Sequence, residues 1–539
     1  MQVKEFIKKL PAFSVPLLVL AIYFLFHNNL ISENSWKIIL GFLFSVTLAL
    51  SLVPFRNYFK FKLPAKIEKY LPYILAGFGF VVYGIYGLEK FSHFQNPTWD
   101  FGLFDQVVWN LSKLHNTPTS LLGIHFFGDH FSPILYLIAP IYWIYNSPIS
   151  LILFEILIVC LGALPVYWLA KKRFKTIFLP ITLCLAYIFY IGNQYAINFS
   201  FHPTTLFATL FLFAFYFFEE KKYFWHFIFI ILALMCREDT AIYIAAYGIF
   251  LLVRKRSIGT IHALVGAIWY VASTKYIMPH FASWVDLRYA SFALFGKTPP
   301  EILRNIIIHP VSALSLFFNS PEKVLSFLSI FIGFGFLAIL APTFWIIILP
   351  MIGIRFWSSG LFWHSEFHYG APISAILVLG TIFAISYLKK NIKFPLEFFI
   401  SVFLLVNLCL MTYLLQLPVH NIVHKSFYSL IDEFNSVDKA IKLIPNQDSV
   451  SAQDPFVSHL SHRRDVFLFP NKEAKFILLD VLSSTYPVTK LEYNKEVKEI
   501  LASPNYGIKF NEGRVILFER GLISDIKPSN EVTDALNQN

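Results

Sequence analysis

Charged residues are scarce in this sequence of 539 residues, at 14% for Asp, Glu, Lys and Arg together. A soluble protein has about a quarter of such residues. Cysteine is also scarce: its four residues all fall inside apolar runs, which argues against a disulfide framework or a zinc–thiolate site. The motifs GxxxxGK, HExxH and GxSxG are absent, and this weakens the cases for a P-loop ATPase, a zincin or a serine hydrolase.

Long apolar runs are what the sequence has in abundance, with 56% hydrophobic residues and 60 phenylalanines. Runs near the length that crosses a bilayer recur from residue 12 to about residue 417. We therefore predict an α-helical polytopic membrane protein with about 13 transmembrane helices. The predicted spans are 12–30, 36–54, 71–88, 149–170, 176–194, 203–218, 223–236, 240–253, 259–277, 324–341, 343–357, 371–388 and 398–416.

The positions of the basic residues predict the orientation in the membrane. The net charge of +11 does not indicate a nucleic-acid partner, because the basic clusters lie at the ends of apolar runs. If the run 130–145 crossed the membrane, the cluster KKRFK at 171–175 would lie outside. If 130–145 is instead re-entrant or interfacial, about 20 Lys and Arg residues lie inside against about 10 outside. We therefore predict a multi-pass protein of the cell membrane with a cytoplasmic N-terminus and an extracytoplasmic C-terminal domain.

The composition divides the chain into three predicted regions. Residues 1–70 are expected to form an extra N-terminal transmembrane pair followed by a basic cytoplasmic loop. Residues 71–418 are expected to form the main transmembrane module, with an outer loop at 89–148. Beyond about residue 420, short apolar strands alternate with polar helical stretches, which predicts a small extracytoplasmic α/β domain over 419–539.

The stretch TWDFGLFDQVVWNLSKL, residues 98–114, places two aspartates beside aromatic residues at the membrane boundary. Apolar residues at helical spacing predict an amphipathic interfacial helix over 101–114. Asp100 occupies the position of a helix N-cap, so that capping and a functional role explain it about equally well. Capping does not explain Asp105, which lies inside the predicted helix next to Gln106.

A second polar group is HFFGDHFSP at 125–133, which contains His125, Asp129 and His130. Carboxylate oxygens favour Mg²⁺ or Mn²⁺, and imidazole shifts the preference toward Mn²⁺ or Zn²⁺. The structural alternative is a turn with hydrogen-bonded interfacial histidines.

The sequence REDT at 237–240 lies between two short predicted spans. Arg237, Glu238 and Asp239 form either a structural ion pair or a site in which the arginine binds phosphate and an acid binds a hydroxyl. His202, His368 and Tyr369 are candidates to line the same outward cavity. The spacing H-x-E-x-H at 364–368 is only a weak indication of zinc.

Several of these motifs resemble an uncharacterised prokaryotic family of membrane proteins, known as a domain of unknown function. The pattern D-x-G-x-x-D-Q-x-x-W-N at 100–110 is similar to the opening motif of that family. Further similar motifs are HFSP at 130–133, FHP at 201–203, HY before a proline at 368–372, and SVSAQ…HLSxR…FP at 449–470. The acids at 238–239 fit as well, although lysine is more usual than Arg237 before them.

The layout of that family is similar to the GT-C superfamily of integral-membrane glycosyltransferases. Those enzymes take a sugar from a polyprenyl phosphate on the outer face of the membrane, and their first large outer loop carries an essential acid, often with a divalent metal. The resemblance implies a GT-C-like fold and an inverting transfer from a polyprenyl-phosphate sugar to the hydroxyl of an unknown glycan, lipid or protein. It implies membrane lipid as the surroundings and no nucleic acid.

Within this hypothesis each candidate residue has an expected role. Asp105 is the first choice for the base and Asp100 the second, because a desolvated carboxylate has a raised pKa. The expected donor-phosphate residues are Arg237, Glu238, Asp239, His202, His368 and Tyr369. A divalent metal, Mg²⁺ or Mn²⁺, would be held by Asp100, Asp105, His125, Asp129 and His130. The sequence leaves open whether a metal is needed.

Two other function classes fit a polar cavity in a membrane protein. A transporter or flippase of a lipid-linked substrate would also collect acids and histidines. The polar segments here are predicted to lie on one face, whereas alternating access needs polar residues near the midplane. A receptor or assembly factor that works through the C-terminal domain is a third alternative.

Overall fold

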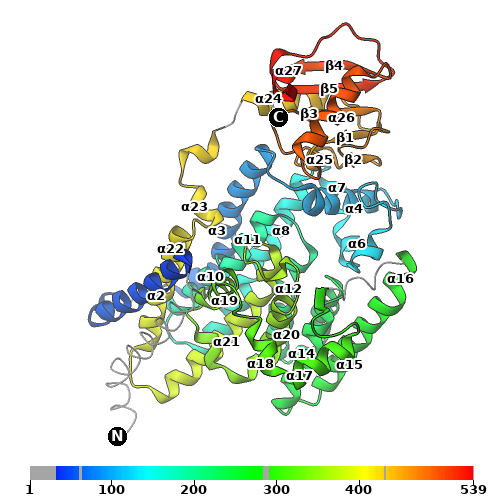
Figure 1. Cartoon of the computed structure of the whole chain (residues 1–539). Coiled ribbons are helices and arrows are strands. Elements are labelled where there is room, and N and C mark those ends of the chain that lie inside the picture. Colours follow the sequence, from blue (N-terminus) through cyan, green and yellow to red (C-terminus); the bar gives the residue numbers. More distant parts are fainter. Residues whose placement is uncertain (1–31, 60–62, 283–290, 430–431, 538–539) are drawn as a thin grey trace.

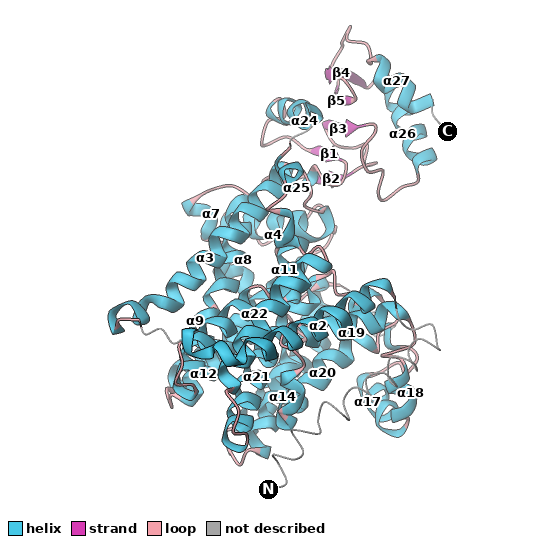
Figure 2. Cartoon of the chain, turned by 90° about the vertical axis from the view of Figure 1, so that its left-hand side faces the viewer, coloured by secondary structure: helices cyan, strands magenta, loops and turns pink. Residues whose placement is uncertain are grey.

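The computed structural model describes residues 32–59, 63–282, 291–429 and 432–537. The predicted span 12–30 lies outside these residues. The described chain is mostly helical, and its strands form one small sheet near the C-terminus. Helices make up one end of the molecule and the sheet lies at the other, as two views at right angles show (Figures 1 and 2).

Five helices among the described residues are long and apolar enough to cross a membrane. Each matches a predicted span, and together they confirm a membrane protein with several apolar helices. They are Glu33–Tyr58 (α2, Glu33–Leu52, with η1, Val53–Phe59), Ala65–Ser92 (α3), Ile149–Arg173 (α8, Ile149–Leu161, and α9, Ala163–Arg173), His368–Asn391 (η8, His368–Gly370, and α21, Ala371–Asn391) and Leu396–Leu414 (α22).

The count of about 13 spans is not supported, because the other predicted spans are short or broken helices. Five further apolar helices have only 10–17 residues: Ile134–Ile144 (α6, Ile134–Ile138, and α7, Ile141–Ile144), Pro203–Glu219 (α12), Tyr223–Leu234 (α13), Thr240–Val253 (α14) and Pro342–Phe356 (η6, Pro342–Phe344, and α20, Trp345–Phe356). A helix of 17 residues is about 25 Å long, less than the roughly 30 Å of the hydrocarbon core.

The predicted span 176–194 is broken in its second half. Helix α10 (Phe178–Ile188) ends and α11 (Ile191–Phe199) begins after two residues. Asn193 Nδ2 donates to the carbonyl of Tyr187 at 2.7 Å, and Gln194 Nε2 donates to that of Phe189 at 2.8 Å. These amides take the place of the backbone donors that a continuous helix would supply to those carbonyls. The break leads the chain toward FHP at 201–203.

Two other predicted spans also depart from a continuous α-helix. The span 259–277 is α15 (Gly259–Ala272) followed by a π-helical turn, η3 (Ser273–Ile277). The span 324–341 is α19 (Pro321–Ile332) followed by a 3₁₀ turn, η5 (Leu337–Leu340). Shorter helices connect these elements: α16 (Met278–Phe281), α17 (Pro299–Ile308), α18 (Pro310–Ser315), η7 (Leu361–Trp363), α23 (Pro418–Asn421) and η9 (Lys425–Tyr428).

Helices α14 and α15 are held at very short distance by glycine. A Cβ atom added to Gly248 would lie 2.3 Å from the backbone nitrogen of Ala263, and one added to Gly259 would lie 2.4 Å from the carbonyl oxygen of Gly248. Small residues let apolar helices approach backbone to backbone, where dispersion contacts replace the hydrophobic effect. Helix α14 begins at Thr240, the last residue of the REDT motif, so this helix pair directly follows the REDT turn.

The C-terminal sheet has five strands in the order β2–β1–β3–β5–β4. Strand β1 pairs in parallel with β2 and β3, and β5 pairs antiparallel with β3 and with the edge strand β4. All five side chains of β3 are buried. The elements are α24 (Asp432–Lys442), β1 (Val450–Ala452), α25 (Val457–Leu460), β2 (Val466–Leu468), β3 (Phe476–Asp480), α26 (Lys490–Ala502), β4 (Tyr506–Glu512), β5 (Val515–Arg520) and α27 (Asn530–Asn537).

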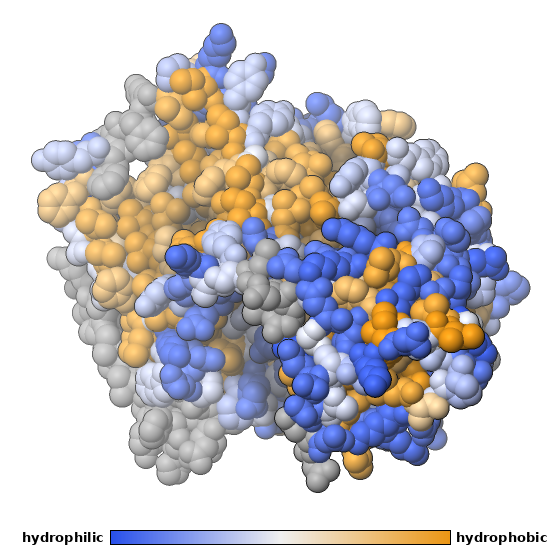
Figure 3. Space-filling model, turned by 90° about the horizontal axis from the view of Figure 1, so that it is seen from above, coloured by the Kyte–Doolittle hydropathy of each residue, from blue (hydrophilic) through white to orange (hydrophobic). Residues whose placement is uncertain are grey.

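The two parts of the molecule differ in surface character. Seen from the end that carries the sheet, the nearest surface is largely hydrophilic, and a large hydrophobic surface lies farther away to one side (Figure 3). An apolar surface of that extent on a folded chain marks contact with lipid or with another protein. The sheet therefore forms a water-facing cap at one end of an apolar helical body.

Candidate functional site

The first outer segment does not begin as an ordinary capped helix. Residues Thr98–Gly102 form a π-helical turn, η2, that continues into α4 (Leu103–Ser112). Asp100 lies inside this turn, and the cap position belongs to Pro97. The backbone N–H of Thr98 donates to Oδ1 of Asp454, at 2.5 Å, in the C-terminal domain. The interpretation of Asp100 as an N-cap is therefore wrong.

Helix α4 is also more buried than an interfacial helix would be. Eight of its ten residues are buried, including Asp105 and Gln106. Gln106 Nε2 donates to the carbonyl of Arg464 at 3.0 Å and to Ser120 Oγ at 2.7 Å. The amphipathic pattern over 101–114 thus faces the helical body on one side and the C-terminal domain on the other, and not open water.

Asp105 lies at the centre of this contact and has no exposed surface. The hydroxyls of Tyr142 and Ser461 each donate to one of its two carboxylate oxygens. His462 Nε2 lies 3.1 Å from Oδ2 of the same carboxylate. A buried carboxylate is tolerated when donors surround it in this way. The contacts of Asp105 are those of a residue that joins two parts of the fold.

Asp100 lies in different surroundings, beside the histidines of two later segments. His202 Nε2 lies 3.1 Å from Asp100 Oδ1, and 28% of the Asp100 side chain is exposed. The ring of His202 stacks on that of His368 with 3.6 Å between centroids. Neither nitrogen of His368 has a hydrogen-bond partner within the described residues, although the side chain is buried. Such unpaired buried nitrogens indicate a position where a ligand or water binds.

The contacts of His202 determine how protons are shared with Asp100. Its Nδ1 lies 3.1 Å from the carbonyl oxygen of Ser200, which can only accept a hydrogen bond. Its Nε2 faces Asp100. Both contacts are hydrogen bonds only if His202 is an imidazolium beside a carboxylate, or if His202 is neutral and Asp100 carries the proton.

A second layer of polar residues holds this pair in place, and the sequence analysis missed it. Asn96 Nδ2 donates to Ser200 Oγ at 2.7 Å, and the ammonium of Lys90 donates to the same oxygen at 3.2 Å. Glu155 Oε1 accepts from the backbone N–H of His202 at 3.3 Å. Lys90 and Glu155 are only 6% and 2% exposed, so that both charged groups lie in the interior.

Ser200 itself has a strained backbone at φ 80° and ψ −178°. This region is almost restricted to glycine, and a residue held there costs about 1–3 kcal/mol. The hydrogen bonds from Asn96 and Lys90 to its side chain offset that cost. The strain turns the chain so that His202 follows directly and faces Asp100.

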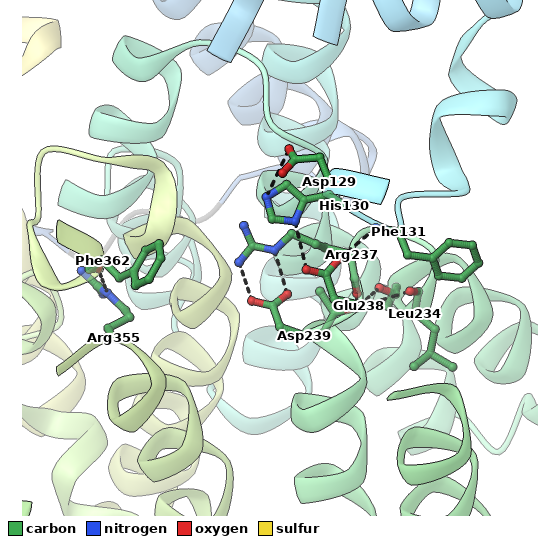
Figure 4. A network of polar contacts seen from close by, with 11 residues as sticks. Asp129, His130, Phe131, Leu234, Arg237, Glu238, Asp239, Arg355 and Phe362 are labelled. Atoms are coloured by element: carbon green, nitrogen blue, oxygen red, sulfur yellow. Dashed lines mark hydrogen bonds and ion pairs between the residues drawn. The ribbon is translucent and has the colours of Figure 1, made fainter. Parts of the chain in front are cut away.

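The REDT turn binds the segment that follows the first outer helix, as Figure 4 shows. Arg237 donates to both carboxylate oxygens of Asp239, with Nε 2.9 Å from Oδ1. Glu238 Oε1 lies 2.9 Å from His130 Nδ1, and its Oε2 accepts from the backbone N–H of Phe131 at 3.0 Å. Both acids of the turn therefore have partners. Asp239 pairs with Arg237, whereas the partners of Glu238 lie outside the turn.

Two arginine side chains, Arg237 and Arg355, lie near the segment that carries His368 and Tyr369. The guanidinium of Arg237 lies 5.8 Å from the centre of the Tyr369 ring. Arg355, from α20, is 4% exposed; its Nε donates to the carbonyl of Phe362 at 3.2 Å, and its NH1 has no partner within the described residues. The ring of His368, which stacks on His202, also lies 4.1 Å from the Tyr369 ring between centroids. Segments far apart in the sequence thus meet in one polar cluster.

Among the predicted metal ligands, only Asp129 and His130 lie together, with His130 Nε2 4.0 Å from Asp129 Oδ2 (Figure 4). Asp100 and Asp105 face the different partners described above, and His130 faces Glu238. His125 caps α5 (Phe126–Asp129): its Nδ1 accepts from Phe127 N at 3.1 Å, and its Nε2 lies 2.8 Å from Asn116 Oδ1. Over the part of the chain that the structure describes, no three His, Cys, Asp or Glu side chains are arranged to hold a metal ion, including those at 364–368. The residues present do not fit the predicted Mg²⁺ or Mn²⁺ site.

Of the residues that the sequence analysis missed, two carried a signal. Glu155 is an acid within an apolar run, and Arg355 lies at the end of another. Acids and bases in such runs usually mark a site or a buried partner. Lys90 could not be distinguished from an ordinary flanking cation. Asp454 and Ser461 carried no signal, since their roles depend on how the C-terminal domain docks.

Comparisons with known proteins place the chain in a family. No curated protein matches it. A family model described as "Predicted membrane protein (DUF2079)" matches residues 90–512, which include α4, the polar cluster and most of the C-terminal domain. The match covers well over half of the chain and confirms the resemblance to this family. The chain belongs to this family of predicted membrane proteins, whose function is unknown.

Proposed function

We propose that the protein is a membrane glycosyltransferase that moves a sugar from a polyprenyl-phosphate donor to an acceptor hydroxyl on the outer face of the membrane. The observation that carries the proposal is the partly exposed Asp100 carboxylate, paired with His202, in a cluster that also holds buried cations. In this proposal the cluster lies at the boundary between the apolar helices and the C-terminal domain, because the backbone N–H of Thr98, two residues from Asp100, donates to Asp454 of that domain. A lipid-linked substrate and a water-soluble acceptor can both reach such a boundary.

The proposed base is Asp100. One oxygen faces His202, and the other has no hydrogen-bond partner within the described residues. In the proposed step that second oxygen takes the proton of the acceptor hydroxyl. The hydroxyl oxygen then forms a bond to the anomeric carbon while the bond from that carbon to the phosphate oxygen breaks, and its electron pair leaves with the polyprenyl phosphate. Attack from the side opposite the phosphate inverts the configuration.

The proposed role of His202 is to position Asp100 and to share its charge. If His202 is the imidazolium while Asp100 gains the acceptor proton, the pair changes from neutral to a net charge of +1. That change occurs as negative charge builds on the departing phosphate. A charge that is already oriented costs no reorganisation during the reaction, which is the basis of electrostatic catalysis.

Arg237 and His368 are the proposed phosphate ligands. Arg237 presents a planar fork of five donors, and Asp239 engages only two of its three nitrogens. Neither ring nitrogen of His368 has a partner within the described residues; the N–H nitrogen can donate to a phosphate oxygen, and the other nitrogen can accept from a sugar hydroxyl. Tyr369, under the Arg237 guanidinium, is suited to pack against an isoprenoid or a sugar ring. No metal takes part in this scheme.

Asp105 has a different role in this proposal from the one expected from the sequence. A base must touch the hydroxyl that it deprotonates. Asp105 has no exposed surface, and protein donors meet both of its oxygens. We therefore propose Asp100 as the base and Asp105 as the residue that holds the C-terminal domain over it.

The decisive experiment is a transfer assay with purified protein and a panel of radiolabelled polyprenyl-phosphate sugars. Release of polyprenyl phosphate together with a sugar product, dependent on Asp100, supports the proposal. Binding of the donor without any chemical conversion, together with its movement across reconstituted vesicles, would instead assign a flippase or transporter. Failure of every donor both to bind and to react, by a protein with an intact fold, would exclude this substrate class.

A further inference from the structure

A large cavity is lined by residues of the basic clusters, which are predicted to lie on the cytoplasmic side. It shares no lining residue with the polar cluster around Asp100 and His202. Its volume is about 690 Å³. The start of α3, the connection between α9 and α10, and the connection between α21 and α22 enclose it. Its lining residues are Arg56, Leu63, Glu68, Lys171, Lys175, Thr176, Ile177, Phe178, Lys389, Phe394, Pro395, Leu396, Glu397 and Phe398. Cavities of about 300–1,000 Å³ hold small organic ligands.

The charged side chains of this cavity leave an excess of positive charge. Lys171 lies 2.6 Å from Glu68, and Lys389 forms an ion pair with Glu397. Glu397 is further engaged by the backbone N–H of Thr176, at 3.1 Å. Both acids of the lining therefore have partners within it.

Two further cations of the lining have no acidic partner within the described residues. Arg56 makes only a long contact of 3.4 Å to the carbonyl of Val53, and Lys175 is exposed. With four cations and two acids, the lining carries a net charge of 4 − 2 = +2. The cavity thus suits a ligand with negative charge.

The remaining walls of the cavity are apolar. The rings of Phe178 and Phe398 lie 6.2 Å apart, and Leu63, Ile177 and Phe394 lie beside them. Next to Glu68, helix α3 exposes a row of large apolar side chains: Ile67, Tyr70, Ile74, Phe78, Val81 and Ile85. The spacing of three to four residues places this row on one helix face, as in a helix that faces lipid. The row begins at Ile67, the neighbour of the lining residue Glu68, so the apolar surface of α3 starts beside the cavity.

We propose that the cavity binds the phosphate headgroup of an anionic phospholipid, with Arg56 and Lys175 as its charge partners and the acyl chains along the exposed row of α3. A free phosphate would use the two cations but not the apolar walls or the adjoining lipid-facing helix. Basic recesses between helices on the cytoplasmic side are a recurrent way of binding such headgroups. The site is separate from the proposed sugar-transfer site.

The test compares lipid binding by wild-type protein and by Arg56→Gln/Lys175→Gln. Both side chains are exposed and leave the two ion pairs of the lining intact. The matched control is Lys222→Gln/Arg256→Gln, one Lys and one Arg that are exposed in other predicted cytoplasmic loops. Native mass spectrometry from a neutral detergent, with added phosphatidylglycerol or phosphatidylcholine, counts bound lipid and gives its affinity.

We expect wild type and the control to retain phosphatidylglycerol in preference to phosphatidylcholine. The cavity variant should bind phosphatidylglycerol roughly 30-fold more weakly, since each cation near a headgroup contributes about a 5-fold gain. Equal binding of the two lipids by wild type, or an equal loss in the control, would overturn the proposal.

A separate experiment adds millimolar inorganic phosphate without lipid and follows thermal unfolding. If phosphate alone reproduces the stabilisation by phosphatidylglycerol, the ligand is a soluble phosphate and the lipid assignment is wrong.

Discussion

The hydroxyl of Ser461 donates a hydrogen bond to a carboxylate oxygen of Asp105, which lies 356 positions earlier in the chain. Together with the hydrogen bond that the backbone N–H of Thr98 donates to Asp454, it fixes the C-terminal domain on the segment that contains η2 and α4. The C-terminal domain therefore holds the segment that carries Asp100 in position, although Asp100 itself lies outside that domain. Each of the following predictions separates a residue that shapes the site from a residue that acts in it.

Asp105→Asn should destabilise the protein. The amide group of asparagine places an N–H₂ where a hydroxyl now donates, so that one buried donor loses its acceptor. Such a loss costs about 1–3 kcal/mol. Limited proteolysis and thermal unfolding should show earlier release of the C-terminal domain. Unchanged protease resistance combined with abolished sugar transfer would mean that Asp105 acts in the chemistry after all.

Asp100→Asn should have the reverse effect. The side chain is partly exposed and caps no helix, so the folded state should keep its thermal stability. A lost general base typically lowers the rate by about 10²–10⁴-fold. The measurement is transfer from a donor that the wild-type protein uses, with thermal unfolding as the control. A variant with wild-type turnover would remove Asp100 from the proposed mechanism.

Arg237→Lys should weaken donor binding more than it weakens the fold. Lysine keeps the charge and one contact to Asp239, but it loses the planar fork that can hold a carboxylate and a phosphate together. We expect the KM for the donor to rise, with the stability largely retained. A sharply lower melting temperature at unchanged KM would show that Arg237 serves only as the partner of Asp239.

The contact between the two parts of the molecule should weaken in acid. His459 stacks on Phe91 and Phe94, with 3.9 and 4.1 Å between ring centroids, and burial lowers its pKa to about 3 from the usual 6.5. Between these two pH values the unfolded chain binds more protons than the folded chain. The free energy of unfolding should thus be highest above about pH 6.5 and fall as the pH decreases toward 3, by at most roughly 1.4 kcal/mol per pH unit.

The variant His459→Phe provides the control for this effect. Phenylalanine keeps an aromatic ring between Phe91 and Phe94 but cannot take up a proton. Its unfolding, followed by denaturant titration at pH 7 and pH 5, should depend less on pH than that of the wild type. Identical pH dependence in both proteins would assign the effect to other groups.

The predicted topology is open to a direct labelling test. In a Cys409→Ser background, the other cysteines are buried. Asp525→Cys and Ser257→Cys then introduce one exposed thiol each, in the C-terminal domain and in the RKRS loop. A membrane-impermeant thiol reagent on intact cells should label the first and not the second. Labelling in the opposite order would reverse the orientation and place the polar cluster on the inner face.

The sequence sufficed for the features that depend on local pattern. The lengths of the apolar runs identified the five long helices, and the alternation of short strands with polar helices identified the C-terminal sheet. The segments with His202, His368 and Arg237 were singled out for their polar character. In the structure His202 stacks on His368, and Arg237 lies over the ring of Tyr369, the neighbour of His368. Each of these signals is carried by a short stretch of chain.

The remaining features depend on tertiary contacts that no local pattern records. Asp100 and Asp105 are five positions apart, yet which of them faces the cluster is decided by Ser461 and Asp454, more than 350 positions away. The break after α10 depends on Asn193 and Gln194 turning back to carbonyls of the preceding turn. The count of about 13 spans is not supported because several apolar stretches form short or broken helices, and the composition of a stretch does not record where its helix ends.

The bond between Asp105 and Ser461 also has a consequence for biosynthesis. At about 5–20 residues per second, the ribosome needs roughly 20–70 s to make the 356 residues that separate the two. During most of that time the segment around Asp105 is already outside the ribosome. Ser461 and His462, whose side chains will contact its carboxylate, have not yet been synthesised. The growing chain must keep this acid hydrated at the membrane boundary until the last domain arrives. A chain that stops before residue 432 would leave the Asp105 carboxylate without Ser461 and His462, the C-terminal groups that lie against it.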